Sequence, residues 1–115
     1  MSDTNLKYWQ NKFSNKSSVL ELTTDKSRSS KINYTLGIES FTFNQRLSTS
    51  VKTFSQIKNT NLLSVLITSF SCLLHRYTAS EDIVIGSYIQ KSDNSGFNTL
   101  AFRNYLSGDT LFSQL

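Results

Sequence analysis

The sequence lacks proline and has only one cysteine, one histidine and four glycines among its 115 residues. The single Cys72 excludes an internal disulfide, and it lies in an apolar stretch, where a free thiol behaves as a small hydrophobic group. One cysteine and one histidine cannot complete the ligand shell of a zinc ion, and the isolated glycines form no phosphate-binding loop. We therefore predict no metal site and no nucleotide-binding loop, and the unpaired thiol favours a reducing, intracellular setting.

Long apolar runs and concentrated charge are also absent. No apolar run approaches the ~20 residues of a membrane-spanning helix, and the polar N-terminus lacks the apolar core of a signal peptide. We therefore expect a cytoplasmic protein without a membrane partner. The net charge is +4, but the closest basic cluster, Lys26, Arg28 and Lys31, is interrupted by serines. Because a nucleic-acid footprint needs basic residues gathered on one face, we predict a solvated surface and no nucleic-acid partner.

Apolar spacing predicts helices in the first half of the chain. Leu6, Trp9 and Phe13 fall on one face of a short N-terminal helix. A second helix is predicted over 44–58, with Asn44 as its N-cap. Most of its remaining positions are Ser, Thr, Gln and Lys, so this helix depends on packing for its stability.

The strongest helical pattern runs over 61–77, with Asn61 as its N-cap. We expect a helix this apolar to be covered on most sides. Its continuous apolar stripe consists of Leu62, Leu66, Phe70, Leu73 and Tyr77. Its narrow polar face consists of Ser64, Thr68, Ser71 and His75. We expect His75 to lie on the surface without a catalytic role, because a general base needs an orienting partner and a substrate within reach.

Alternating apolar residues predict strands over 34–43 and 98–105. The continuous β-branched run at 83–85, bounded by turn residues, predicts a further strand over 83–88 that is buried on both faces, and the three strands share one sheet. The first changes phase between Ile38 and Phe41, which requires a bulge or break. Asp109 is expected to cap a final helix that stops at Leu115 after less than two turns. The predicted fold class is α/β, a small mixed sheet with the two longer helices packed on it.

Four stretches match one known family in order and approximate spacing. The match is carried by YWQ at 8–10, LELTTDKSR at 20–28, LLHRYTASEDIVIGS at 73–87, and NTLAFR at 98–103 followed by LSGD at 106–109. The family patterns are YWQ, LELPTDRPR, LLxRYTGQEDIVIGS and NTLVLR followed by LSGDPTFRELL. The chain therefore resembles the first part of the C-terminal lobe of a nonribosomal peptide synthetase condensation domain.

The resemblance implies part of a chloramphenicol-acetyltransferase-like lobe, so that residues 1–115 are a partial condensation domain without its N-terminal lobe. The family joins acyl groups carried on the phosphopantetheine arms of carrier domains. Its HHxxxDG motif belongs to the N-terminal lobe and is missing here, so we expect no catalytic residue and no activity of this chain alone. The implied partners are carrier-protein domains or a complementary synthetase chain, and no cofactor is expected to bind directly.

Asn98 and Arg103 match the family's NTxxxR pattern and are the candidate residues of the substrate tunnel. The structural alternative, which we favour, is that Asn98 shapes a turn and Arg103 pairs at a strand end. Asp82 is expected to cap or turn the chain and not to act as an acid. Most of the family's helical spacer is missing, since residues 85–91 lead directly to 95–99. A second function class stays open, a noncatalytic module that docks on synthetase or carrier domains.

Overall fold

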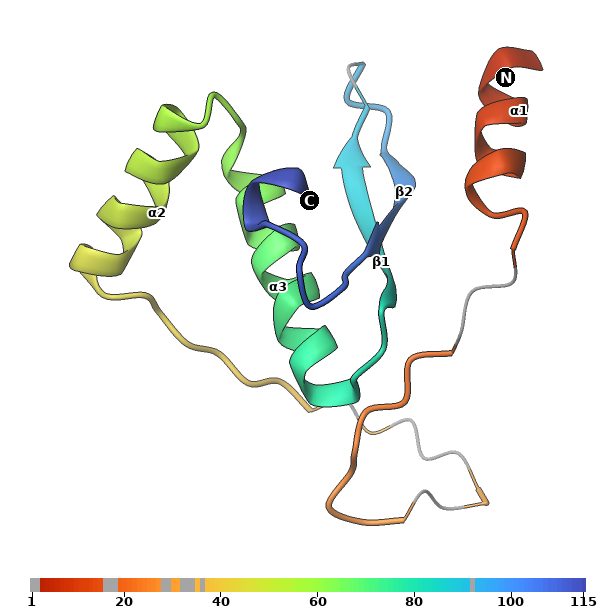
Figure 1. Cartoon of the computed structure of the whole chain (residues 1–115), viewed down its shortest axis with the longest axis horizontal. Helices are drawn as coiled ribbons and strands as arrows, with labels where there is room; N and C mark the ends of the chain where they lie inside the picture. Colours follow the sequence, from red (N-terminus) through yellow and green to blue (C-terminus); the bar gives the residue numbers. More distant parts are fainter. Residues whose placement is uncertain (1–2, 16–18, 28–29, 32–34, 36, 92) are drawn as a thin grey trace.

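The computed structural model describes residues 3–15, 19–27, 30–31, 35, 37–91 and 93–115. These residues form three α-helices, two strands and a 3-10 turn: α1 (Asp3–Lys12), α2 (Gln45–Ile57), α3 (Leu62–Thr78), β1 (Asp82–Gln90), β2 (Phe97–Tyr105) and η1 (Phe112–Gln114). Figure 1 shows α2 and α3 on one side of the strand pair and α1 on the other. The α/β class is confirmed for the described residues.

Asparagine caps begin both long helices, as predicted. The side-chain oxygen of Asn44 accepts a hydrogen bond of 2.9 Å from the Leu47 N–H, and that of Asn61 accepts one of 2.7 Å from the Ser64 N–H. Each bond satisfies a backbone donor that the helix itself leaves unpaired. Within the described residues no single helix is long and apolar enough to cross a membrane; α2 and α3 pass such a test only together, with a bend of 110° between them.

The two strands form an antiparallel hairpin whose register runs from Asp82 opposite Tyr105 to Gln90 opposite Phe97. The Lys91 N–H donates to the Gly96 carbonyl over 2.9 Å and closes the turn. Gly96 adopts φ 141°, a conformation that side chains rarely allow. The short connection that replaces the family's spacer therefore joins β1 directly to β2, and both strands extend beyond the predicted 83–88 and 98–105.

The predicted strand over 34–43 is wrong for residues 37–43, which form no strand, while residues 34 and 36 lie outside the described positions. Ile38 and Phe41 are 76% and 84% exposed, so neither apolar side chain has a sheet face to pack on. The sheet in the described chain has two antiparallel strands, and the prediction of a mixed sheet was therefore wrong. The predicted final helix is only the 3-10 turn η1.

The core lies between α3 and the hairpin. The face of α3 that packs on the hairpin differs from the apolar face that we expected to be covered. Its buried apolar centre consists of Leu74, Ile83 and Leu106. Ser71, on the predicted polar face, is fully buried and accepts a hydrogen bond of 3.1 Å from the Asn104 side-chain amide. Small side chains on this face let the strands approach closely, and a hydrogen bond satisfies the buried hydroxyl. The apolar stripe that we expected to be covered is instead 39–69% exposed.

Candidate functional site

Arg103 is the most completely bonded side chain in the hairpin. Its Nε donates to Asp82 Oδ1 over 2.8 Å and its Nη2 to Asp82 Oδ2 over 2.7 Å, which makes a two-pronged ion pair. The pair forms because Arg103 stands opposite Val84, two residues beyond Asp82 on the same face of β1. The hydrogen bonds lower the pKa of the Asp82 carboxyl and raise the pKa of the Arg103 guanidinium.

The remaining nitrogen of Arg103 binds the last residue of α1 and the segment that follows it. Its Nη1 donates to the Lys12 carbonyl over 2.8 Å and to the Asn15 carbonyl over 3.2 Å. The guanidinium also lies 5.5 Å from the ring centre of Phe13 and 5.0 Å from that of Tyr105. Helix carbonyls without intrahelical partners attract cations, so Arg103 fixes α1 against the hairpin. This geometry agrees with pairing at a strand end.

Asn98 lies apart from Arg103. It is exposed, stands opposite Ile89 and belongs to β2, so it does not shape the turn as the structural alternative supposed. Side chains alternate between the faces of a strand, which places Asn98 on the face of Asn104 toward α3 and Arg103 on the face toward α1. The hairpin therefore does not bring the two tunnel candidates together.

His75 contacts the backbone just beyond the end of α3. One ring nitrogen, Nδ1, lies 2.8 Å from the Ser80 carbonyl oxygen, and the residue is half-buried. Our expectation of a surface position was therefore only partly correct. The contact holds the chain just after α3, where the C-cap residue Ala79 adopts the left-handed conformation with φ 53°. Asp82 is the first residue of β1, and its carboxylate forms the ion pair with Arg103. The carboxylate therefore has a structural role.

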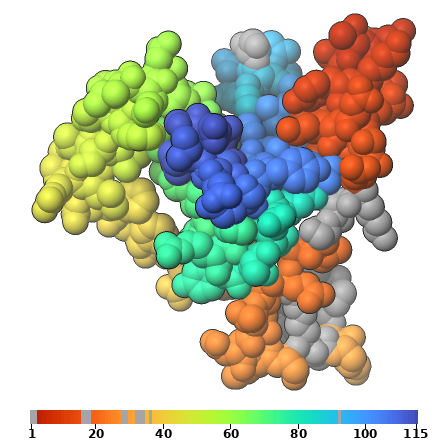
Figure 2. All heavy atoms as spheres, in the orientation of Figure 1, coloured from red at the N-terminus to blue at the C-terminus, as the bar shows by residue number. Residues whose placement is uncertain are grey.

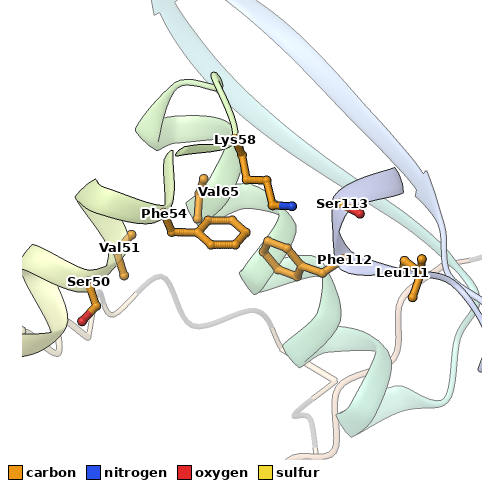
Figure 3. Close-up of a pocket in the computed structure, with 8 residues that line it drawn as sticks. All are labelled: Ser50, Val51, Phe54, Lys58, Val65, Leu111, Phe112 and Ser113. Carbon is orange, nitrogen blue, oxygen red and sulfur yellow. The ribbon is translucent and has the colours of Figure 1, made fainter. Parts of the chain in front are cut away.

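A cavity of about 570 Å³ opens between α2, α3 and the C-terminal segment. Figure 2 shows the C-terminal atoms in dark blue beside the green α2–α3 region. In Figure 3 the Phe54 and Phe112 rings lie next to each other, and they meet edge to face with centres 5.7 Å apart and 72° between the ring planes. The residues that line the cavity are Ser50, Val51, Phe54, Lys58, Val65, Leu111, Phe112 and Ser113.

This hollow is broadly open to solvent, unlike the clefts that bury most of a bound small molecule. No acid, histidine or cysteine is among its lining residues, so it supplies no general base for a nucleophile. Sequence reasoning missed it because its walls come from residues far apart along the chain. The only signal was the apolar Leu111–Phe112 pair. Across the described ranges, no group of three or more His, Cys, Asp or Glu residues is arranged to hold a metal ion.

Comparison with known proteins agrees with the resemblance in the sequence. A family model described as a condensation domain matches residues 2–107. The chain is 31% identical over 114 residues to bacitracin synthase 3 of Bacillus licheniformis, covering 92% of this chain and 2% of that protein. It is 32% identical over 106 residues to tyrocidine synthase 3 of Brevibacillus parabrevis, covering 85% of this chain and 2% of that protein.

A third relative, gramicidin S synthase 2 of Brevibacillus brevis, is 30% identical over 105 residues, covering 84% of this chain and 2% of that protein. The predicted resemblance is thereby confirmed. The chain spans only 2% of the length of these curated relatives.

Proposed function

We propose that this chain, which belongs to the condensation-domain family, is part of a domain that forms amide bonds between acyl groups carried by nonribosomal peptide synthetases. The observation that carries the proposal is the family match over residues 2–107. The relatives are synthases of bacitracin, tyrocidine and gramicidin S, which supports peptide synthesis as the setting. From the resemblance in the sequence, we further propose that the chain is the first part of the C-terminal, chloramphenicol-acetyltransferase-like lobe of such a domain.

The residues of this chain supply structure to that reaction and no acid–base catalyst. The sequence has no HHxxxDG motif, and its single histidine lies against the Ser80 carbonyl. A general base needs hydrogen-bonding reach to the proton that it removes. We therefore expect residues 1–115 alone to form no amide bond, and the activity to require an N-terminal lobe that carries HHxxxDG.

The substrates in this proposal are thioesters on the phosphopantetheine arms of carrier domains, which bind as partners and not as a resident cofactor. Asn98 and Arg103 remain the proposed tunnel residues, with different roles. Asn98 is exposed and available to a substrate. Arg103 is 4% exposed and bonded to Asp82 and to the end of α1, so it acts by positioning the hairpin.

The test is a condensation assay with donor and acceptor carrier proteins loaded with aminoacyl groups, read by intact-protein mass spectrometry. The chain alone is expected to give no condensed product. Addition of a separately expressed N-terminal lobe that contains HHxxxDG is expected to restore product. Turnover by the chain alone would contradict the proposed role, and so would a reconstituted pair whose product is unaffected by omission of this chain.

A further inference from the structure

The N-terminal helix α1 lies outside the packed core of the described structure. No side chain over Asp3–Lys12 is buried. The extensive packing between described elements joins α2 with α3, α3 with β1 and β1 with β2, and α1 belongs to none of these pairs. Ile83, at the centre of the core, lies on the face of the hairpin toward α3, opposite to the face of Arg103. The core therefore does not depend on α1, which lies across the strands from α3 (Figure 1).

The contacts that hold the end of α1 converge on one buried cation. Arg103 is 4% exposed, and its Nη1 donates to the carbonyls of Lys12 and Asn15. The guanidinium also lies 5.5 Å from the ring centre of Phe13. That ring stacks on Trp9 with centres 6.1 Å apart and 23° between the planes. A single side chain of β2 thus holds this segment by hydrogen bonds and by an aromatic contact.

The helical state of α1 depends on this docking. α1 has 10 residues, and isolated helices shorter than roughly 12–15 residues are only marginally stable in water. A segment of this length that leaves the hairpin therefore loses its helix as well. Docking and helix formation support each other, which gives the segment two distinct states.

We propose that residues 3–15 are a strap that closes over Arg103 and opens as a unit. When it is closed, the strap is helical and covers the guanidinium. When it is open, the strap is unfolded while α2, α3 and the hairpin keep their structure. Opening costs no unpaired buried charge, because Arg103 stays bonded to Asp82 through Nε and Nη2 and water reaches its Nη1.

The shape of Arg103 sets the balance between the two states. Its planar guanidinium binds Asp82 with two nitrogens and the strap with the third. A lysine has one compact ammonium group and cannot serve both partners in this geometry. The inference is separate from the condensation reaction, because the strap is a conformational device that is observed on this chain itself.

The test measures hydrogen exchange of the backbone amides by NMR on the whole 115-residue chain, at several urea concentrations below the unfolding transition. The α1 amides are expected to exchange through an opening that depends less on urea than the opening of the α3 amides, because a local opening exposes less surface. Trp9 is the only tryptophan in the sequence, so quenching of its fluorescence by acrylamide reports on the strap independently.

Variants test the role of Arg103. Arg103→Lys should speed exchange of the α1 amides by at least about tenfold, the effect of losing one hydrogen bond to a charged group, and should make Trp9 easier to quench. The α3 amides should change much less. Arg46→Lys, at an exposed position of α2, is the matched control and should leave the exchange of α1 unchanged.

A second pair of variants applies if circular dichroism shows that Arg103→Lys has lost its helices. Phe13→Ala removes the ring beside the guanidinium and should speed exchange of the α1 amides by about threefold or more. Phe41→Ala is its matched control, because Phe41 is 84% exposed.

Two outcomes would overturn the inference. The first is equal urea dependence for the α1 and α3 amides of the unaltered chain, which would show that the chain opens only as a whole. The second is exchange of α1 that is no faster in the test variant than in its matched control. Condensation is measured in a separate assay with loaded carrier proteins, so failure of one proposal does not decide the other.

Discussion

At the scale of single residues, Arg103 joins parts of the chain that lie far apart in the sequence. Its guanidinium binds the Asp82 carboxylate at the start of β1 and two carbonyls at the end of α1. A lysine at this position has one compact charge and cannot reproduce the planar, two-pronged contact. The structural contribution of Arg103 therefore depends on its shape as well as its charge.

The ion pair predicts how stability depends on pH. Because the Arg103 hydrogen bonds lower the pKa of folded Asp82 below its ordinary value of 3.8, the carboxylate contributes stability that is fully present above that value. The contribution is lost as the pH falls through the lowered folded pKa. Urea unfolding of the chain should thus show a falling midpoint on acidification below about pH 4, and Asp82→Asn should flatten this fall.

Asp93 provides the comparison for that experiment. Its pKa is also lowered, chiefly by the hydrogen bond from the Ser95 N–H, but it lies in the exposed hairpin turn. Asp93→Asn should change the midpoint at neutral pH less than Asp82→Asn does, because it leaves no buried guanidinium without its partner. A larger effect at Asp93 would contradict the role given to the Arg103 pair.

Asn98 gives a second residue-scale prediction, which concerns activity. In the pair reconstituted with an N-terminal lobe, Asn98→Ala should lower the rate of product formation more than His75→Ala, because Asn98 is exposed on β2 and His75 binds the Ser80 carbonyl. Quenched time points analysed by mass spectrometry give the rates. Equal losses, or a greater loss at His75, would count against the tunnel assignment.

At the scale of elements, what the sequence could predict depended on how local each interaction is. The caps of α2 and α3 involve residues three positions apart, and both were predicted. The strand expected over 34–43 needed a neighbouring strand, which local alternation cannot supply. The inward face of α3 was also missed, because the buried contact between Ser71 and Asn104 spans 33 positions. Periodicity identifies a helix but leaves the choice of buried face to tertiary packing.

The caps allow a quantitative test at this scale. Asn61→Ala should lower the free energy of unfolding by about 1 kcal/mol, because it removes the acceptor for the Ser64 N–H. Asn61→Ser is the matched control, since serine is about as good an N-cap. Chemical denaturation monitored by the helical circular dichroism signal measures both. Similar losses in the two variants would show that the side-chain bond is not what stabilises the start of α3.

At the scale of the whole molecule, the chain exposes more surface than a compact protein of its mass. Its accessible surface is 10179 Å² for 13.1 kDa, whereas a compact monomer of that mass has roughly 6,400 Å². Its Cα radius of gyration is 17.2 Å, against about 13 Å for a compact domain of this length. The described core has few fully buried side chains, so we expect the free energy of unfolding to be small.

This surface predicts the behaviour of the isolated chain in solution. The chain should bind a hydrophobic dye, unfold over a broad temperature range and aggregate on concentration, because the apolar residues of α3 from Leu62 to Tyr77 include exposed side chains and the two-stranded sheet has open edges. Dye fluorescence, scanning calorimetry and light scattering measure these properties. A monodisperse monomer with a sharp two-state transition and no dye binding would contradict the prediction.

The contacts of Arg103 with α1 also order the events of folding. The packing of α2 on α3, of α3 on β1 and of β1 on β2 joins elements that follow one another along the chain. The bonds from Arg103 to Lys12 and Asn15 instead span 91 and 88 positions. Loops that long close slowly. We therefore expect residues 45–106 to assemble first, and the N-terminal helix to attach last and to be released first.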